Sequence, residues 1–488
     1  MAEPAPSACY DPYVLSSDGV REPPTTLRQA LWKIGPGMIL AASIVGTGEL
    51  IATTHAGAKA GFAVLWLVVI SCFIKVFVQI ELGRFAIASG ETTLTSFARL
   101  PGPGRLFIWW WFFMMLTTQA QISAMIGGVG YTIYMAIPEA TEGLDRPALP
   151  WAAAVALGTA LLLVRGTYRR IERSMIVLVV LFTVLTVACV LLLPFNEQFA
   201  FGWGDLAGGL TFHIPTDRTV ILAAVAMIGI TGVGASELIA YPYWCIEKGY
   251  ARNVGPNDSS EAWRRRAQGW LRVMKLDAWV SLAVYTVATL AFFILGAAVL
   301  NAGGTEGLPD EMDGLLRSLA DMYAPVLGPK TAKIFIVLGA FAVLYSTLVA
   351  STAANSRSGT DFLRVNGLIA PRGPEERFRW VQRFSVGFMV LGFTLFAFFP
   401  NPVHMVMIGG FAQALTLPMI AAAALYLRYR RTDRRLTPAV HPSLMPRRAS
   451  AATSTPSRPT PYLLITFSSG TCSRMRSSIR SRPTIAYS

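Results

Sequence analysis

The sequence VGTGELIA at 45–52 returns, almost unchanged, as VGASELIA at 233–240. Each copy lies inside a long apolar segment and places a glycine three residues before a glutamate, Gly46 before Glu49 and Gly234 before Glu237. Glycine loosens a helix, and an ionisable side chain far from water is retained where it faces a cavity, a partner or an ion. The pair therefore predicts two interrupted helices that build a binding site within a membrane.

The composition around this pair is that of a polytopic helical membrane protein. The 488 residues are 53% hydrophobic and only 14% charged. Several apolar runs reach the roughly 20 residues that a helix needs to cross the hydrocarbon layer. An all-α fold with about ten transmembrane helices is predicted, at 36–58, 62–83, 106–137, 149–164, 174–194, 219–246, 273–300, 332–354, 382–400 and 403–428.

The distribution of Lys and Arg along the chain predicts its membrane topology. The formal net charge is +14, but Lys and Arg gather in alternate loops at 165–173, 248–272 and 357–379, and in the C-terminal tail. Such clusters face the cytoplasm. A multi-pass protein of the cell membrane is therefore predicted, with both termini cytoplasmic, the lipid bilayer as its surroundings and no nucleic acid as a partner.

The first and sixth spans enter the membrane from opposite sides, so two five-span halves are predicted to be related by inversion. Repeat one covers about 36–194 and repeat two about 219–428. Together they form a transporter domain at 31–428, which follows a cytoplasmic segment at 1–30. Residues 429–488 are rich in Arg, Ser and Pro, and a disordered tail is expected there.

A broken helix exposes carbonyl oxygens at one half-helix end and amide hydrogens at the other. Two such carbonyls and two carboxylates would form an all-oxygen cage of formal charge minus two, which suits hard divalent ions such as Mg²⁺, Mn²⁺ or Ca²⁺. The predicted metal ligands are the side chains of Glu49 and Glu237 and the carbonyls of Gly46 and Ala235. Further candidates for the substrate pathway are Thr47, Ser236, Lys75, Gln121 and Gln413.

Three interpretations of the site remain open at this level. The two carboxylates would also meet a cationic or zwitterionic organic solute, with Lys75 in the place of a coupling cation. The third possibility, besides a metal-ion site and an organic-solute site, is a non-transporting membrane scaffold or sensor. The role of Lys75 is a separate question: it pairs with Glu81, or it neutralises Glu49 and so weakens the affinity of the site for a dication. A single membrane glutamate can be a protonated packing residue, but two at matched positions favour a functional site.

Several motifs of catalysis are missing from the sequence. It has no nucleotide-binding loop, nucleophilic triad or metalloprotease motif, and its glycines interrupt helices instead of cradling phosphate. We therefore predict a secondary-active transporter that is not an enzyme and needs no cofactor, the metal ion being the transported substrate. The sequence does not indicate an oligomeric state.

Beyond these features, the chain resembles the natural resistance-associated macrophage protein (NRAMP) family of divalent metal transporters. The resemblance extends over about 30–428 and includes GPG at 35–37, AGA at 56–58, LW at 65–66, VGA at 233–235 and LTLP at 415–418, together with Gln79, Arg84 and Gly90. It implies the LeuT-like fold, a 5+5 inverted repeat in which helices 1 and 6 are broken.

The same resemblance shows departures at the metal site. The family's D-P-G-N signature falls on residues 46–49, so Glu49 stands where an asparagine ligand is expected. The family's methionine ligand falls on Leu238, or on Glu237 if the register slips by one residue. Its acidic pair in the third span falls on Thr118 and Gln121. The resemblance thus implies a divergent site that lacks the soft ligand and the usual proton route, and Mg²⁺ or Mn²⁺ is the expected cargo.

Overall fold

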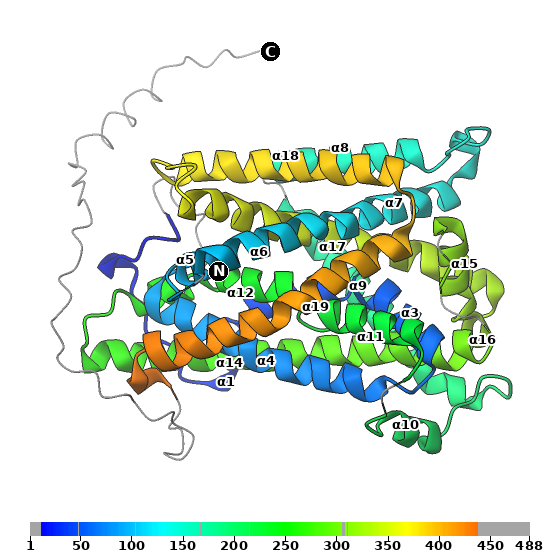
Figure 1. The fold of residues 1–488 in the computed structure, drawn as a ribbon, viewed down its shortest axis with the longest axis horizontal. Helices are drawn as coiled ribbons and strands as arrows, with labels where there is room; N and C mark the ends of the chain where they lie inside the picture. Colours follow the sequence, from blue (N-terminus) through cyan, green and yellow to red (C-terminus); the bar gives the residue numbers. More distant parts are fainter. Residues whose placement is uncertain are drawn as a thin grey trace, which may run out of the picture. The chain divides into compact units, whose positions relative to one another are not determined.

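The computed structural model describes residues 11–46, 48–102, 104–165, 168–213, 215–304, 308–309 and 311–437. All regular secondary structure within these ranges is helical (Figure 1). Each of the ten predicted spans coincides with a helix or an interrupted helix, so the predicted all-α fold is confirmed. Eight of the spans are long and apolar enough to cross a membrane, and the interrupted first span and the shorter fourth span complete the set.

The spans of the first half follow the predicted order. They are α2 (Pro36–Ile44) with η2 (Gly48–Thr53) and α3 (Thr54–Ala60), α4 (Leu65–Ser89), α6 (Gly104–Thr117) with α7 (Gln119–Ala136), α8 (Leu149–Arg165) and α9 (Tyr168–Leu192). Those of the second half are α11 (Arg218–Ile230) with α12 (Ala235–Glu247), α14 (Glu261–Leu295) with η5 (Gly296–Asn301), α17 (Pro329–Val365), α18 (Pro374–Phe398), and α19 (Pro402–Tyr426) with η6 (Leu427–Arg431).

Short helices connect these spans. They are η1 (Ser17–Gly19), α1 (Leu27–Leu31), α5 (Thr93–Ala98), η3 (Pro138–Ala140), η4 (Leu193–Phe195), α10 (Trp203–Gly209), α13 (Tyr250–Val254), α15 (Met312–Asp321), α16 (Ala324–Leu327) and η7 (Arg434–Leu436). In Figure 1, α8 and α18 lie side by side along one edge of the bundle, α4 and α14 lie along the opposite edge, and α19 crosses obliquely between them.

The interior consists of two large clusters of buried apolar side chains. One is built mainly from α7, α9, α15 and α17, and the other mainly from α4, α6, α12 and α14. The first interrupted helix contributes to both clusters, with Leu50 in the former and Leu40 in the latter. The helix breaks therefore lie where the two hydrophobic cores meet, and dense packing on both sides fixes their positions.

The start of α2 is held by a carboxylate from another helix. Asp277 of α14 is fully buried and accepts hydrogen bonds from Gly35 N at 2.9 Å and from Gly37 N at 2.5 Å. An anion at a helix N-terminus satisfies amides that lack an intrahelical acceptor. Tyr241 of α12 donates its hydroxyl to the same carboxylate at 3.1 Å, so one side chain joins α2, α12 and α14.

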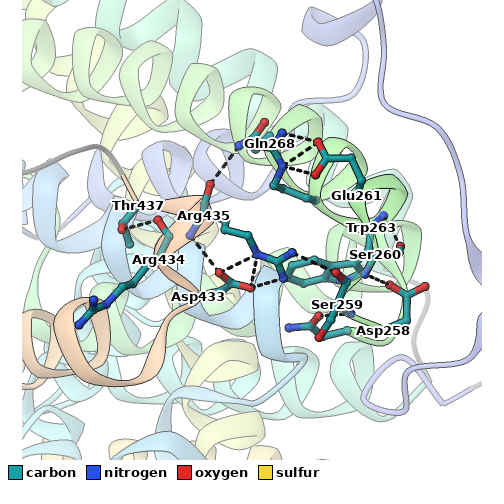
Figure 2. A network of polar contacts seen from close by, with 12 residues as sticks. Asp258, Ser259, Ser260, Glu261, Trp263, Gln268, Asp433, Arg434, Arg435 and Thr437 are labelled. Carbon is teal, nitrogen blue, oxygen red and sulfur yellow. Dashed lines mark hydrogen bonds and ion pairs between the residues drawn. The ribbon is translucent and has the colours of Figure 1, made fainter.

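The segment after α19 is bound to the bundle. Arg84 of α4 donates to the carbonyl of Leu436 at 2.6 Å. Figure 2 shows Arg435, which forms an ion pair with Asp433 at 2.7 Å and donates to the carbonyl of Ser259 just before α14. Residues 429–437 of the predicted tail thus contact the transporter domain, whereas 438–488 lie outside the described residues.

Candidate functional site

The first interruption follows α2, whose last helical residue is Ile44. A β-carbon at Gly46 would collide with Thr347 of α17, so only glycine allows this close approach. The chain resumes at Gly48 as a π-helical turn, a form that is common at functional sites. The carbonyl of Gly46, one of the predicted metal ligands, accepts a hydrogen bond from Leu50 N at 2.8 Å.

The second interruption separates α11 from α12. Helix α11 ends at Ile230, Gly232 adopts a φ of 63° that favours glycine, and Gly234 caps α12, which begins at Ala235. The first amides of α12 point back toward the break, as they do at every helix N-terminus. This half-helix end favours a negative charge, and Glu237 lies in its first turn.

Glu49 is fully buried in the first interruption but is held by residues of other helices. Its Oε1 atom accepts a hydrogen bond from Thr289 Oγ1 of α14 at 2.6 Å and another from Gly232 N at 3.2 Å. Its Oε2 atom has no hydrogen-bond partner in the described part of the chain. The Glu49 carboxylate therefore bridges the two interruptions and keeps one oxygen available.

Glu237 borders a small cavity. The cavity measures about 30 Å³ and is lined by residues from α2, α7, α12 and α17, among them Ser43, Gln121, Ser236, Glu237 and Asn355. Glu237 Oε2 is buried and, within the described ranges, also lacks a hydrogen-bond partner. A space of this size holds about one water molecule or one small ion.

Two glutamines support the wall of this cavity. Gln413 of α19 is buried, accepts a hydrogen bond from Ser236 N at 3.0 Å, and donates to Gln121 Oε1 at 3.1 Å. Gln121 in turn donates to the carbonyl of Val406 at 3.3 Å. The first turn of α12 is thus tied to α7 and α19 by neutral amides that position Glu237 and add no charge.

Lys75 lies midway along α4 and is only 5% exposed. Its Nζ atom donates to two main-chain carbonyls, Ile228 O at 2.5 Å and Thr231 O at 2.6 Å. The ammonium lies close enough to interact electrostatically with both Glu49 and Glu237. The suggested pair with Glu81 does not form, because the Glu81 carboxylate binds Arg84 and Arg428.

The described residues contain no cluster of three or more His, Cys, Asp or Glu side chains that could hold a metal ion. An ion bound near the interruptions would therefore complete its shell with amide, hydroxyl or main-chain oxygens, or with water. Hard divalent cations accept such oxygen ligands readily, whereas softer transition metals prefer nitrogen and sulfur. The available groups thus suit a hard, partly hydrated cation.

A comparison with known protein families identifies the chain. A family model described as "Natural resistance-associated macrophage protein-like" matches residues 37–434, the whole bundle with both interruptions. The chain belongs to this family. The resemblance in the sequence is thereby confirmed for the membrane domain.

Two curated relatives are similar to this chain at about a quarter of the aligned positions. A divalent metal cation transporter MntH from Yersinia enterocolitica is 25% identical over 353 residues, 70% of this chain and 76% of the relative. An MntH of the same description from Mycobacterium tuberculosis is 26% identical over 319 residues, 64% of this chain and 66% of its own length. At these identities the site residues have to be judged from this chain's own geometry.

Solved structures confirm the LeuT-like architecture. A manganese transporter mutant from Eremococcus coleocola superimposes with a TM-score of 0.60 at 17% identity, over 85% of this chain and 82% of that one. MHP1, a nucleobase-cation-symport-1 family transporter, gives a TM-score of 0.52 at 16% identity, over 82% and 79% of the respective chains. Likeness at such low identity describes the fold and leaves the cargo open.

The predicted site residues fall into three groups. Glu237, Ser236 and Gln121 line the cavity, and Gln413 binds to two of them. Glu49, Gly46, Ala235 and Lys75 lie around the interruptions without lining it. Thr47 lies outside the described residues.

Three further polar groups at the site were not predicted. The Thr289 hydroxyl and the Gly232 amide both donate hydrogen bonds to Glu49, and Asn355 of α17 lines the cavity. Asn355 offered a weak signal, since it is an amide directly after the predicted eighth span. Thr289 offered none, because a threonine in an apolar helix ordinarily bonds its own backbone.

Proposed function

We propose that this NRAMP-family chain is a secondary-active transporter of divalent metal ions that works by alternating access, with Mg²⁺ or Mn²⁺ as its cargo. The binding site in this proposal is the space at the two helix interruptions. Glu49 and Glu237 supply the carboxylate ligands, and the carbonyls of Gly46 and Ala235 add neutral oxygens. The transported ion is a substrate, and no resident cofactor is involved.

One observation carries this proposal. Glu49 Oε2 and Glu237 Oε2, at matched positions of the two interruptions, are both buried and have no hydrogen-bond partner among the described residues. A buried carboxylate oxygen that lacks a donor is costly, and a bound cation removes this cost. Because the two glutamates come from the two repeats, an ion between them would contact both halves of the transporter.

The cavity that Glu237 borders adjoins the proposed site at one of its four ligands, and its size favours an ion over an organic solute. A volume of about 30 Å³ is far below the roughly 300 Å³ at which pockets for small organic molecules begin. Its polar lining consists of neutral oxygen and nitrogen groups together with Glu237. These properties support a small cation that has shed part of its water shell.

The proposal also places the transporter in the cell membrane with both termini in the cytoplasm. The cavity is lined by α2 between its start and the break, and by Ala240 and Trp244 farther along α12. These segments lie between the interruptions and the membrane face at which α2 begins. The cavity therefore leads to the cytoplasmic side in this assignment.

Calorimetry on the purified full chain tests the binding site. Mg²⁺, Mn²⁺ and Ca²⁺ are titrated separately into the wild type, Glu49→Gln and Glu237→Gln. Each substitution removes a ligand charge while keeping the side chain's shape, so the affinity is expected to fall about ten- to hundredfold or more. Glu139→Gln, a change on the exposed connection after α7, serves as the control and should bind like the wild type.

Uptake into liposomes then tests transport. Wild-type protein is expected to accumulate the ions that it binds, and the two site variants are expected to lose most of this uptake. Metal binding that is unchanged in both variants would refute the assigned site. Binding without uptake would instead support a sensor.

A further inference from the structure

Lys75 makes a contact that the proposed metal site does not need. Its side chain crosses from α4 to the end of α11, where the ammonium is bound by the carbonyls of Ile228 and Thr231 at 2.5 and 2.6 Å. The helical part of α11 ends at Ile230, so these are carbonyls of its last turn and of the residue that caps it. The last carbonyls of a helix lack intrahelical donors and form the negative end of the helix dipole.

Such a helix end attracts a cation. In transporters with interrupted helices, the carbonyls of unwound segments and of half-helix C-termini coordinate the coupling ion. Here two converging carbonyl oxygens and the electrostatic influence of Glu49 and Glu237 create the same demand for one positive charge. Lys75 already supplies this charge.

We propose that the Lys75 ammonium is a tethered cation that occupies the place where a dissolved monovalent cation would bind at the end of α11. The wild-type protein therefore binds no Na⁺ or K⁺ there. A consequence for transport, that metal uptake requires neither of these ions, rests on the function proposed above. The occupancy of the helix end does not rest on it and is tested separately.

The contacts of neighbouring groups exclude a simpler role in ion pairing. Glu81, two turns farther along α4, is bound by Arg84 and Arg428. No ion pair joins Lys75 to Glu49 or Glu237 in the described part of the chain, and its Nζ partners there are two main-chain carbonyls. The position of the ammonium is thus set by the helix end.

A groove beside Lys75 makes the position testable. Its volume is about 320 Å³, and its lining includes Lys75, Ile74, Ile228, Leu238 and Leu417. Shortening the lysine to alanine would join the vacated space to this groove. A small cation could then reach the two carbonyls from the groove, whereas a methionine would keep the space filled with an uncharged chain.

The experiment measures thermal unfolding of the purified full chain in detergent, without divalent metal, in NaCl, KCl or choline chloride of equal ionic strength. For Lys75→Ala, the midpoint is expected to be roughly 2 to 4 °C higher in NaCl or KCl than in choline chloride, because the ion binds the native state. The wild type, Lys75→Met and the exposed control Lys330→Ala should show no such difference. Equal midpoints for Lys75→Ala in all three salts would overturn the proposal.

Chemical rescue provides a second measurement. Propylammonium carries the missing charge on a chain that fits the apolar groove, so it should raise the midpoint of Lys75→Ala by a similar amount. Propanol, its neutral counterpart, should leave the midpoint unchanged, and an equal rise with propanol would contradict the assigned role of the charge.

If neither Lys75→Ala nor Lys75→Met folds, Na⁺ binding to the wild type still tests the proposal. The wild type is titrated with radioactive Na⁺ and is expected to bind none, so saturable Na⁺ binding to the wild type would refute the proposal. None of these readouts uses a divalent metal. A negative result with Mg²⁺ or Mn²⁺ would therefore disprove the proposed function and leave the role of Lys75 standing.

Discussion

The two copies of the repeated sequence differ in structure far more than their residues suggest. In the first copy, the helix resumes as a π-helical turn and Glu49 is sealed inside the protein by Thr289 and Gly232. In the second copy, an α-helix begins at once and Glu237 borders a cavity from its first turn. One glutamate therefore holds the two interruptions together, while the other borders a cavity.

This difference arises from the neighbours of each copy. Glu49 meets a hydroxyl from α14 and a main-chain amide from the opposite repeat, so its carboxylate has fixed partners. Glu237 meets the amides of its own helix end and a void. Glu49 and Glu237, at equivalent positions of the two repeats, thus have different surroundings and different roles. We infer that Glu49 is the rigid part of the site and Glu237 the part that responds to an ion.

The largest expected effect is on stability when Glu49 is removed. Glu49→Ala leaves the Thr289 hydroxyl and the Gly232 amide, both buried, without their acceptor, so the free energy of unfolding should fall by about 3 to 5 kcal/mol. Glu237→Ala removes a group that borders a void and should cost about 1 kcal/mol or less. Unfolding followed by tryptophan fluorescence in metal-free buffer measures both values. Equal losses would mean that the two copies are equivalent after all.

Much of the fold was predictable because its determinants are local. Apolar runs of spanning length, the Lys and Arg bias of the loops and the repeated octapeptide predict the ten spans and the two interruptions. Gly46 marks the first break, where a β-carbon would collide with Thr347, and Gly234 marks the second, where a β-carbon would meet the side-chain ends of Glu237 and Gln413. These features depend on short stretches of sequence, which is why they could be recognised without coordinates.

The partners of the glutamates could not be predicted in the same way. Thr289 lies 240 residues from Glu49 along the chain, and its hydroxyl leaves no pattern in an apolar helix. The carbonyls that bind Lys75 belong to the main chain, so side-chain identities say nothing of them. Such contacts follow from the mutual placement of the two repeats, which sequence periodicity does not determine.

The glycines of the two breaks provide the next test. Gly46→Ala places a β-carbon against Thr347 in a packed core and should destabilise the protein by about 1 to 3 kcal/mol. Gly234→Ala meets the far end of the Glu237 side chain, which can move, so its main effect should be weaker metal binding in calorimetry. Gly387→Ala in α18, where the added carbon meets nothing within 4 Å, is the control and should be neutral or stabilising.

A second substitution that shortens Thr347 tests whether this contact causes the loss of stability in Gly46→Ala. In Gly46→Ala combined with Thr347→Ala, the hydroxyl that the new β-carbon meets is gone, so part of the lost stability should return. Strict additivity of the two single changes would show that the strain comes from the Thr347 β-carbon, which alanine retains, or from another neighbour, and not from the hydroxyl.

An effect of comparable size is expected from the hydroxyl that holds Glu49. Thr289→Val keeps the shape of the side chain but removes the 2.6 Å hydrogen bond to the carboxylate, which should cost about 1.5 to 3 kcal/mol. Thr159→Val in α8 is the matched control, since this buried threonine has a hydroxyl with no partner among the described residues. Its replacement should change the free energy of unfolding little. If the two substitutions cost the same, the Thr289 bond does not fix Glu49.

The smallest change in the free energy of unfolding is expected when one residue is exchanged between the two copies. Ser236 and Gly48 occupy equivalent positions, and the hydroxyl of Ser236 has no partner within the described ranges. Ser236→Gly should therefore lose only about 0.5 to 1 kcal/mol, through the entropy of glycine in a helix. In Gly48→Ser the β-carbon would lie 2.9 Å from Ile230 Cγ2, so this reverse change should cost more. The first break is packed against its neighbours, whereas the second opens on a cavity, so Gly48→Ser should be the costlier change. If Ser236→Gly costs more, the second interruption is the rigid one and not the first.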